Sequence, residues 1–141
     1  MERGDLGIDN GPTTMFVFDE LIATCVRPKI EKVMLSGNRW SAALGCWDFN
    51  ILVMDTIHDM LSRFQARIEV ITWRPPGFAE VLYDRMWELD VPVSDVHSPI
   101  SYMSISQRIA TDPSVNAVFD ADPRHRLGYG FKCREFTPGQ M

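Results

Sequence analysis

Two short apolar segments that each end in acid limit the folds open to this chain more than any other feature of its sequence. Residues 15–19 read Met-Phe-Val-Phe-Asp, and residues 117–122 read Ala-Val-Phe-Asp-Ala-Asp. The first run is too short for a helix and does not alternate with polar residues, which is typical of a central strand covered on both faces. A third predicted strand, residues 68–73, carries Thr72 near its end. The three strand ends could gather oxygen ligands around one Mg²⁺ ion.

Helical periodicity separates these predicted strands. Apolar residues recur at helical spacing in residues 51–64 and 78–89, and residues 101–110 are a third candidate helix. Residues 91–93 predict a short edge strand, and residues 131–136 predict a final strand. This alternation predicts an α/β fold in three layers, a Rossmann-like, mainly parallel sheet with helices on both faces. Sites in such folds form at the carboxyl ends of the strands. The residues that fall there are Asp19, Thr72, Asp120 and Asp122.

Length and composition predict one domain. With 141 residues, 45% of them hydrophobic, the chain can bury one sizeable core. Residues 1–13 combine glycine, proline and polar residues, which predicts a flexible lead-in, and residues 14–141 then form a single domain. Residues 26–50 hold a proline, two glycines and two tryptophans, and here we expect an irregular, cap-like flap with short helical turns.

Charge and cysteine content narrow the classes of function and the compartment. Fourteen Lys and Arg residues against nineteen Asp and Glu residues give a formal net charge of −5, which disfavours broad binding to nucleic acid. Three distant cysteines predict neither a disulfide framework nor a zinc site. With no apolar signal segment and no run long enough to span a bilayer, we expect a cytoplasmic protein without a membrane partner. A local basic surface could still contact phosphate or could simply be solvated; its members would be Arg124, Arg126, Lys132 and Arg134.

Two stretches of the sequence match the motifs of a known superfamily in order and spacing. Residues 70–75 read Val-Ile-Thr-Trp-Arg-Pro and are followed by the helix predicted at 78–89 and then by Asp-Val-Pro-Val-Ser-Asp at 90–95. Residues 117–124 read Ala-Val-Phe-Asp-Ala-Asp-Pro-Arg. Over residues 14–136 this arrangement resembles the haloacid dehalogenase (HAD) superfamily of phosphohydrolases. The resemblance is to its small prokaryotic and phage members, including the phosphatase domains of polynucleotide kinases.

The resemblance implies a role for each strand-end residue. Asp19 would be the nucleophile that attacks phosphorus and also a ligand of Mg²⁺, with Asp120 and Asp122 completing the metal site. Thr72 would bind a phosphate oxygen, and Arg74 would contact the substrate phosphate through its planar guanidinium. If the chain is encoded by a phage, its compartment would be the host cytoplasm.

The sequence departs from the superfamily at two catalytic positions. Leu21 stands where the first motif should carry its general acid and base, two residues after Asp19. Glu20 cannot replace that acid unless the strand has already ended, because neighbouring strand side chains point to opposite faces. The expected lysine is also missing, since Arg108 is the only Lys or Arg between residues 94 and 119 and is the remaining phosphate-binding candidate there. Losing an acid or base commonly costs about 10² to 10⁴ in rate.

Each candidate residue also has a purely structural explanation. Asp19 and Asp120 could cap nearby helix N-termini, and Asp122 is a good turn residue before Pro123. Thr72 could be only a β-branched strand residue, and Arg74 only a solvated loop cation. His97 and His125 stand isolated in predicted loops, without further ligands at a spacing that indicates zinc.

Three functions follow from these observations. The first is a degenerate HAD-like pseudoenzyme, with weak or no catalysis, that binds another protein or a phosphorylated ligand. Its partner could be a host protein or a second copy of itself, held through Trp40 and Trp47, although both rings could instead cover the sheet. The second is an active Mg²⁺-dependent phosphatase acting on nucleotides or nucleic-acid ends. The third is an unrelated doubly wound binding module, which requires that the strand ends do not converge.

Overall fold

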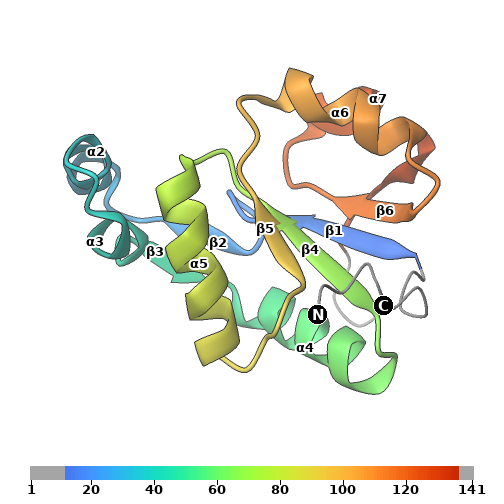
Figure 1. Ribbon diagram of the computed structural model, residues 1–141, viewed down its shortest axis with the longest axis horizontal. Helices are drawn as coiled ribbons and strands as arrows, with labels where there is room; N and C mark the ends of the chain where they lie inside the picture. Colours follow the sequence, from blue (N-terminus) through green and yellow to red (C-terminus); the bar gives the residue numbers. More distant parts are fainter. Residues whose placement is uncertain (1–11, 137–141) are drawn as a thin grey trace, which may run out of the picture.

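A computed structural model describes residues 12–136, and its centre is a five-stranded sheet (Figure 1). The strand order is β5-β4-β1-β6-β7, and every neighbouring pair is parallel. The predicted α/β class and the Rossmann-like parallel sheet are therefore confirmed. The strands are β1 (Thr13–Val17), β4 (Arg67–Ile71), β5 (Asp95–His97), β6 (Val115–Phe119) and β7 (Cys133–Arg134).

Helices cover both faces of this sheet because β1 sends alternate apolar side chains to opposite sides. Phe16 and Phe18 belong to one core cluster, which includes residues of α4 (Ile51–Arg63) and α5 (Pro76–Glu88). Met15 and Val17 belong to the other cluster, which includes Ile105 and Ile109 of α6 (Tyr102–Thr111) and Tyr129 of α7 (Arg126–Tyr129). Two 3₁₀ turns flank α7, namely η1 (Pro123–His125) and η2 (Gly130–Lys132). Among the helices of residues 12–136, none has the length and apolar character needed to cross a bilayer.

A separate flap lies between β1 and α4 and projects from the sheet in Figure 1. Its base is an antiparallel pair, β2 (Ala23–Cys25) with β3 (Trp47–Phe49). Two short helices connect these strands, α2 (Pro28–Ser36) and α3 (Trp40–Leu44). The segment predicted as an irregular flap thus contains short helices, but the sequence did not indicate the hairpin at its base.

Two predicted strands are misplaced. Residues 91–93 form no strand, because Val91 and Val93 are both buried in the core and Pro92 between them has no N–H to donate to a neighbouring strand. The edge strand is instead β5, Asp95–His97. The final strand is only the two residues of β7, since η2 occupies the positions before Cys133. Strand β1 starts at Thr13, and residues 1–11 of the predicted lead-in lie outside the described part of the chain.

Candidate functional site

The chain turns sharply directly after β1 and brings Asp19 to the carboxyl edge of the sheet. The backbone N–H groups of Ile22 and Ala23 both donate to the Phe18 carbonyl at 3.1 Å. Glu20 takes a left-handed conformation, with φ 72°, and its side chain is exposed. The strand has therefore ended before Glu20, so strand alternation does not decide which way that side chain points.

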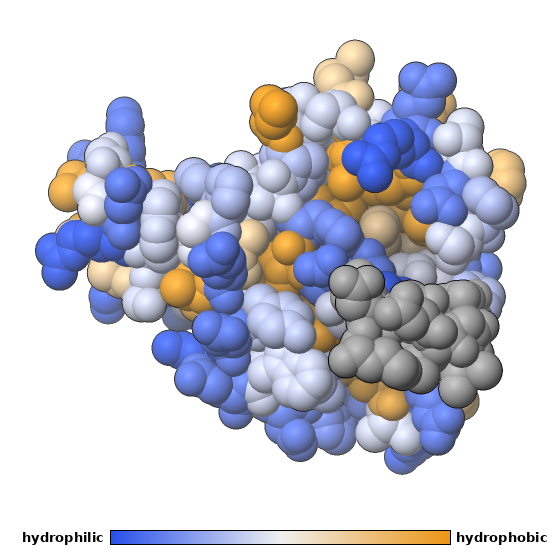
Figure 2. Space-filling view, in the orientation of Figure 1, coloured by the Kyte–Doolittle hydropathy of each residue, from blue (hydrophilic) through white to orange (hydrophobic). Residues whose placement is uncertain are grey.

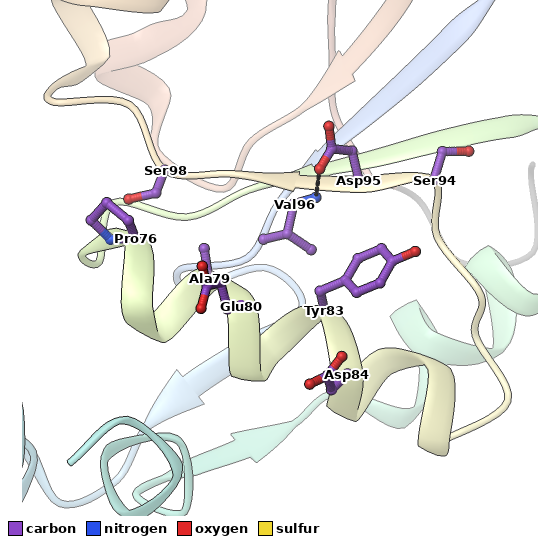
Figure 3. Close-up of a pocket in the computed structure, with 9 residues that line it drawn as sticks. All are labelled: Pro76, Ala79, Glu80, Tyr83, Asp84, Ser94, Asp95, Val96 and Ser98. Carbon is purple, nitrogen blue, oxygen red and sulfur yellow. Dashed lines mark hydrogen bonds between the residues drawn. The ribbon is translucent and has the colours of Figure 1, made fainter. Parts of the chain in front are cut away.

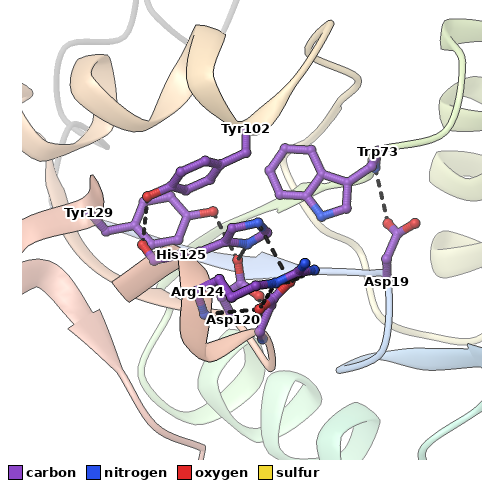
Figure 4. A network of polar contacts seen from close by, with 8 residues as sticks. Asp19, Trp73, Tyr102, Asp120, Arg124, His125 and Tyr129 are labelled. Atoms are coloured by element: carbon purple, nitrogen blue, oxygen red, sulfur yellow. Dashed lines mark hydrogen bonds and ion pairs between the residues drawn. The ribbon is translucent and has the colours of Figure 1, made fainter. Parts of the chain in front are cut away.

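Asp19 is buried among donors from the end of β4. Its Oδ1 accepts a hydrogen bond from the Trp73 backbone N–H at 3.0 Å (Figure 4). It also accepts one from Thr72 Oγ1 at 2.9 Å. Its Oδ2 lies 3.3 Å from Arg74 Nη1 but has no hydrogen-bond partner among the described residues. Burial raises the pKa of the Asp19 carboxyl, and this outweighs the lowering by its donors and by the Arg74 charge. These contacts tie Asp19 to the β4 loop, so the helix-capping alternative does not describe it.

Arg74 is held by the flap. Its Nε donates to Glu31 Oε2 at 2.9 Å and its Nη2 donates to Glu31 Oε1 at 3.0 Å, which forms a bidentate pair. Its guanidinium carbon lies 4.9 Å from the centre of the Trp47 ring, and Trp47 Nε1 also donates to Glu31 at 2.7 Å. Arg74 is therefore not a freely solvated loop cation.

Glu31 is the site residue that sequence reasoning missed. Its side chain projects from α2 and only 3% of the residue is exposed. Burial alone would raise the pKa of the Glu31 carboxyl, but hydrogen bonds from Arg74 and Trp47 outweigh it and lower the pKa below 4.5. The chain contains no local signal for this role, because the partners of Glu31 are distant in sequence.

Asp120 is the centre of a second cluster, at the end of β6. Its Oδ2 lies 2.6 Å from His125 Nδ1 and accepts a hydrogen bond from the Tyr129 hydroxyl at 3.0 Å (Figure 4). Its Oδ1 accepts from the Asp122 backbone N–H at 2.8 Å. The His125 ring stacks on Tyr102, with centroids 4.0 Å apart. Burial and the neighbouring Asp120 raise the pKa of Tyr129, so its hydroxyl remains a donor.

Asp122 serves the turn that follows β6. It is the N-cap of η1, and its Oδ1 accepts the Arg124 backbone N–H at 2.9 Å. Its carboxylate also pairs with the exposed Arg124 guanidinium, with Nη2 2.6 Å from Oδ2. Hydrogen bonds from Arg124 lower the pKa of Asp122. Asp122 therefore acts as a turn residue before Pro123, which is the structural role that the sequence suggested for it.

Both histidines that the sequence left isolated have carboxylate partners. His125 pairs with Asp120 because η1 folds the chain back after Pro123. His97 lies at the end of β5, and its Nε2 is 2.5 Å from Glu69 Oε1 on the neighbouring strand. The pair of Asp120 and His125 had a local signal in the sequence, because the two residues are only five positions apart. The pair of Glu69 and His97 had none, because it depends on the pairing of β4 with β5.

The sequence-predicted site residues thus divide into groups. Asp19, Thr72 and Arg74 contact one another at the end of β1 and β4, whereas Asp120 and Asp122 belong to the cluster at the end of the neighbouring strand β6. Arg108 joins neither group, because it is exposed in the last turn of α6, where its charge acts on Asp112. Lys132 does not contribute to a basic surface, since it is buried and its amine donates to the Ile109 and Asp112 carbonyls.

The three predicted Mg²⁺ ligands are divided between the two clusters in this arrangement. Among the described residues, no three His, Cys, Asp or Glu side chains lie together as a metal site would require. Each of the three predicted ligands is also held by protein donors, Asp19 by the β4 loop, Asp120 by His125 and Asp122 by Arg124. Mg²⁺ binding therefore remains a prediction.

The two flap tryptophans contribute mainly to packing. Trp47 is 5% exposed and belongs to the main core cluster, which leaves it inaccessible to a partner. Trp40 is half-buried against the start of α5, where a Cβ built on Gly77 would lie 2.2 Å from its ring. Trp47 therefore packs in the core over the sheet, as one of the two explanations for these rings expected. Trp40 packs against α5 instead, and the missing side chain of Gly77 makes room for it.

An open groove lies between α5 and β5 (Figure 3), and Ser98 in its lining donates a hydrogen bond to the Arg74 carbonyl. It encloses about 740 Å³, and none of the sequence-predicted site residues lines it. Its lining residues are Pro76, Ala79, Glu80, Tyr83, Asp84, Ser94, Asp95, Val96 and Ser98.

Comparisons of this chain with protein-family models, with curated proteins and with solved structures give no match. The geometry of the two clusters at the carboxyl edge of the sheet is therefore the remaining guide to function. The element of that geometry with the clearest chemical consequence is the Arg74 guanidinium, which is already paired on both sides.

Proposed function

We propose that this chain is a HAD-like protein that does not hydrolyse phosphate esters and that acts by binding another protein. Support for the HAD-like part comes from the sequence motifs and from the sheet order, which places Asp19 after the central strand with Thr72 beside it. Support for the loss of catalysis comes from the occupied Arg74 guanidinium and from the absent acid at position 21.

The pair formed by Arg74 and Glu31 is the observation that carries this proposal. A phosphate that used the Arg74 fork would have to displace the Glu31 carboxylate, which accepts both Nε–H and Nη2–H. Displacement would leave Glu31, a residue with 3% exposure, without its cation. Removing one partner of a buried ion pair is costly, so the pair opposes phosphate binding.

The local charge also opposes an anionic substrate. Two carboxylates, those of Asp19 and Glu31, flank the one guanidinium of Arg74. This group has an excess of negative charge when both acids are ionised. A phosphate dianion would add repulsion in a partly buried setting, where charges are weakly screened.

The first motif offers no replacement for its missing acid. Leu21 is half-buried and cannot exchange a proton. Glu20 has its backbone in the left-handed region and its side chain in solvent, and no side-chain hydrogen bond or ion pair within residues 12–136 holds it near Asp19. A leaving group at this site would therefore lack a positioned general acid.

The test is hydrolysis of para-nitrophenyl phosphate with and without Mg²⁺ by the wild type, Asp19→Asn and Leu21→Asp. We expect the wild type and Asp19→Asn to give the same background rate. Turnover by the wild type that disappears in Asp19→Asn would overturn the proposal. Leu21→Asp restores the acid of the first motif, and Asp19-dependent turnover in this variant alone would support descent from an active enzyme.

A second candidate function is an active phosphatase, favoured by one specific observation. Asp19 Oδ2 is buried without a hydrogen bond among the described residues, which leaves one carboxylate oxygen available to an incoming group. Glu31→Gln would test this candidate, because it keeps the shape of the side chain but removes the competing charge from Arg74. Asp19-dependent turnover in the wild type, increased in Glu31→Gln, would replace the first proposal by this one.

A further inference from the structure

Helix α2 buries a charged side chain and exposes two aliphatic ones. Glu31 is buried, and Met34 and Leu35 pack partly buried against the core, whereas Ile30 and Val33 are 50% and 65% exposed. The bidentate pair with Arg74 fixes Glu31 toward the sheet and leaves Ile30 and Val33 on the outer face. Ile30 and Val33 lie one helical turn apart, so they form a small apolar face beside the exposed lysines of α2.

The same helix carries a charge opposite to that of the chain. Residues 21–47 contain four of the fourteen Lys and Arg residues but only one of the nineteen Asp and Glu residues. That single acid is Glu31, which is buried and paired. The exposed charges of α2 and its N-cap are therefore all positive, namely Arg27, Lys29 and Lys32, and Arg39 adds a cation before α3. The exposed acid of the flap is Asp48, which lies on β3 at its base. Figure 2 shows hydrophilic and apolar side chains side by side on the projecting flap.

The groove between α5 and β5 has the complementary chemistry. Its lining includes the exposed carboxylates of Glu80 and Asp84 on α5, together with Asp95 on β5 (Figure 3). Ala79 and Val96 add apolar surface to the same groove. An acidic rim beside apolar side chains suits a helix that presents lysines beside isoleucine and valine.

Only another molecule can join these two surfaces. In Figure 1, α5 stands between the flap and the groove, so α2 does not reach the groove of its own chain. Helix α3 packs against α5 on one side, and β5 packs against it on the other. Since each copy carries both surfaces, a two-fold axis can place the flap of each copy in the groove of the other.

We propose that two copies of this chain associate by reciprocal docking of α2, through Lys29, Ile30, Lys32 and Val33, into the acidic groove between α5 and β5. The occupant of the groove is a second copy because the chain itself carries both complementary surfaces. This association does not depend on whether the Asp19 site is catalytic. A negative result for dimerisation would therefore leave the proposal about catalysis untouched, and the reverse also holds.

Charge reversal tests the docking directly, with sedimentation velocity from about 1 μM to about 1 mM as the readout, the range in which weak interfaces dissociate. Lys29→Glu with Lys32→Glu makes the flap acidic, and Glu80→Lys with Asp84→Lys makes the groove basic. The four positions are exposed, so circular dichroism should show unchanged folding. Each double variant should raise the dimer dissociation constant by roughly tenfold or more, because like charges then face each other.

The most direct test is to mix the flap variant with the groove variant. An acidic flap then meets a basic groove, and the basic flap meets the acidic groove, so the mixture should form a heterodimer at concentrations at which each variant alone is largely monomeric. The four substitutions combined in one chain should restore the homodimer. The matched control is Asp55→Lys with Asp59→Lys on α4, which reverses two exposed acids outside the groove and should leave dimerisation intact.

Three outcomes would overturn the inference. The first is a wild type that stays monomeric over the whole concentration range at low salt. The second is a dimer that the double variants leave unchanged, which would place the interface elsewhere. The third is a mixture of the two variants that stays monomeric. Ile30→Ser with Val33→Ser should also weaken the dimer, and an unchanged dissociation constant in that variant would contradict the role given to the apolar face.

Discussion

Asp19 and Asp120 follow neighbouring strands at one edge of the sheet, yet their carboxylates are stabilised in different ways. Asp19 is held by the β4 loop and lies beside Arg74, whose charge it shares with Glu31 of the flap. Asp120 is held by His125 and Tyr129, and His125 is packed against Tyr102. The first cluster joins the flap to the sheet by charge, whereas the second joins α6 and α7 to the sheet by hydrogen bonds and aromatic stacking. The same residue type therefore has a structural partner in each region, and neither carboxylate is left exposed to solvent.

The largest effect should follow from removing the cation of the first cluster. Arg74→Ala leaves Asp19 and Glu31 buried together without a positive charge, so we expect a loss of about 3 kcal/mol or more in the free energy of unfolding. Urea denaturation measures this loss. Arg124→Ala is the matched control, because it removes an arginine that pairs with Asp122 in solvent, and it should change stability little. Equal effects of the two substitutions would contradict the importance given to the buried network.

A smaller loss is expected in the second cluster. Asp120→Ala leaves the buried Tyr129 hydroxyl without its acceptor, and this should cost about 2 kcal/mol. Tyr129→Phe removes the same hydrogen bond from the other side. If the two residues act through this bond, the double variant should lose less stability than the sum of the single variants. Strict additivity in denaturation experiments would show that the bond contributes no coupling.

Two glycines, Gly77 and Gly128, allow aromatic rings to pack closely, one near each cluster. A Cβ on Gly77 would lie 2.2 Å from the Trp40 ring, and one on Gly128 would lie 1.5 Å from the Tyr102 hydroxyl. We expect Gly77→Ala and Gly128→Ala each to cost roughly 1–3 kcal/mol through overpacking. Gly128→Ala should be the more damaging, because Tyr102 also donates to the His125 carbonyl and stacks on its ring. Thermal denaturation that shows no loss for either variant would mean that these rings move freely.

Much of the sheet could be predicted because its evidence is local. Apolar runs without alternation indicated buried parallel strands, and the acids after them were correctly expected at the carboxyl edge. Strand β5 could not be located, since the apolar Val91 and Val93 belong to a buried loop and the true strand reads Asp95–His97. Asp19, Thr72, Asp120 and Asp122 were all expected around one ion. Asp19 and Thr72 do contact each other, together with Arg74, whereas Asp120 and Asp122 belong to the second cluster.

The partners of the site residues were less accessible to sequence reasoning. Glu31 lies 43 residues from Arg74, and nothing in α2 distinguishes it from a solvated acid. Its role arises only when the flap folds over the β4 loop. His125 is five residues from Asp120, so its role could have been suspected, but it requires the turn that Pro123 begins.

The smallest effects, those of pH, should have opposite signs for the two acids that flank Arg74. The folded-state pKa of Asp19 is raised from 3.8, so the wild type should lose stability relative to Asp19→Asn as the pH rises through that raised pKa. The folded-state pKa of Glu31 is lowered from 4.5, so its advantage over Glu31→Gln is present above 4.5 and is lost as the pH falls through the lowered pKa. Denaturation from about pH 3 to about pH 8 measures both differences. Two differences of the same sign would contradict this account of the cluster.

Calorimetric titration with Mg²⁺ and then with inorganic phosphate, on the wild type and Asp19→Asn, tests the central claim most directly. If Arg74 and its two carboxylates close the site, neither protein should give saturable heat with either ligand. Saturable binding to the wild type that Asp19→Asn abolishes would show that the site is open and would contradict the account.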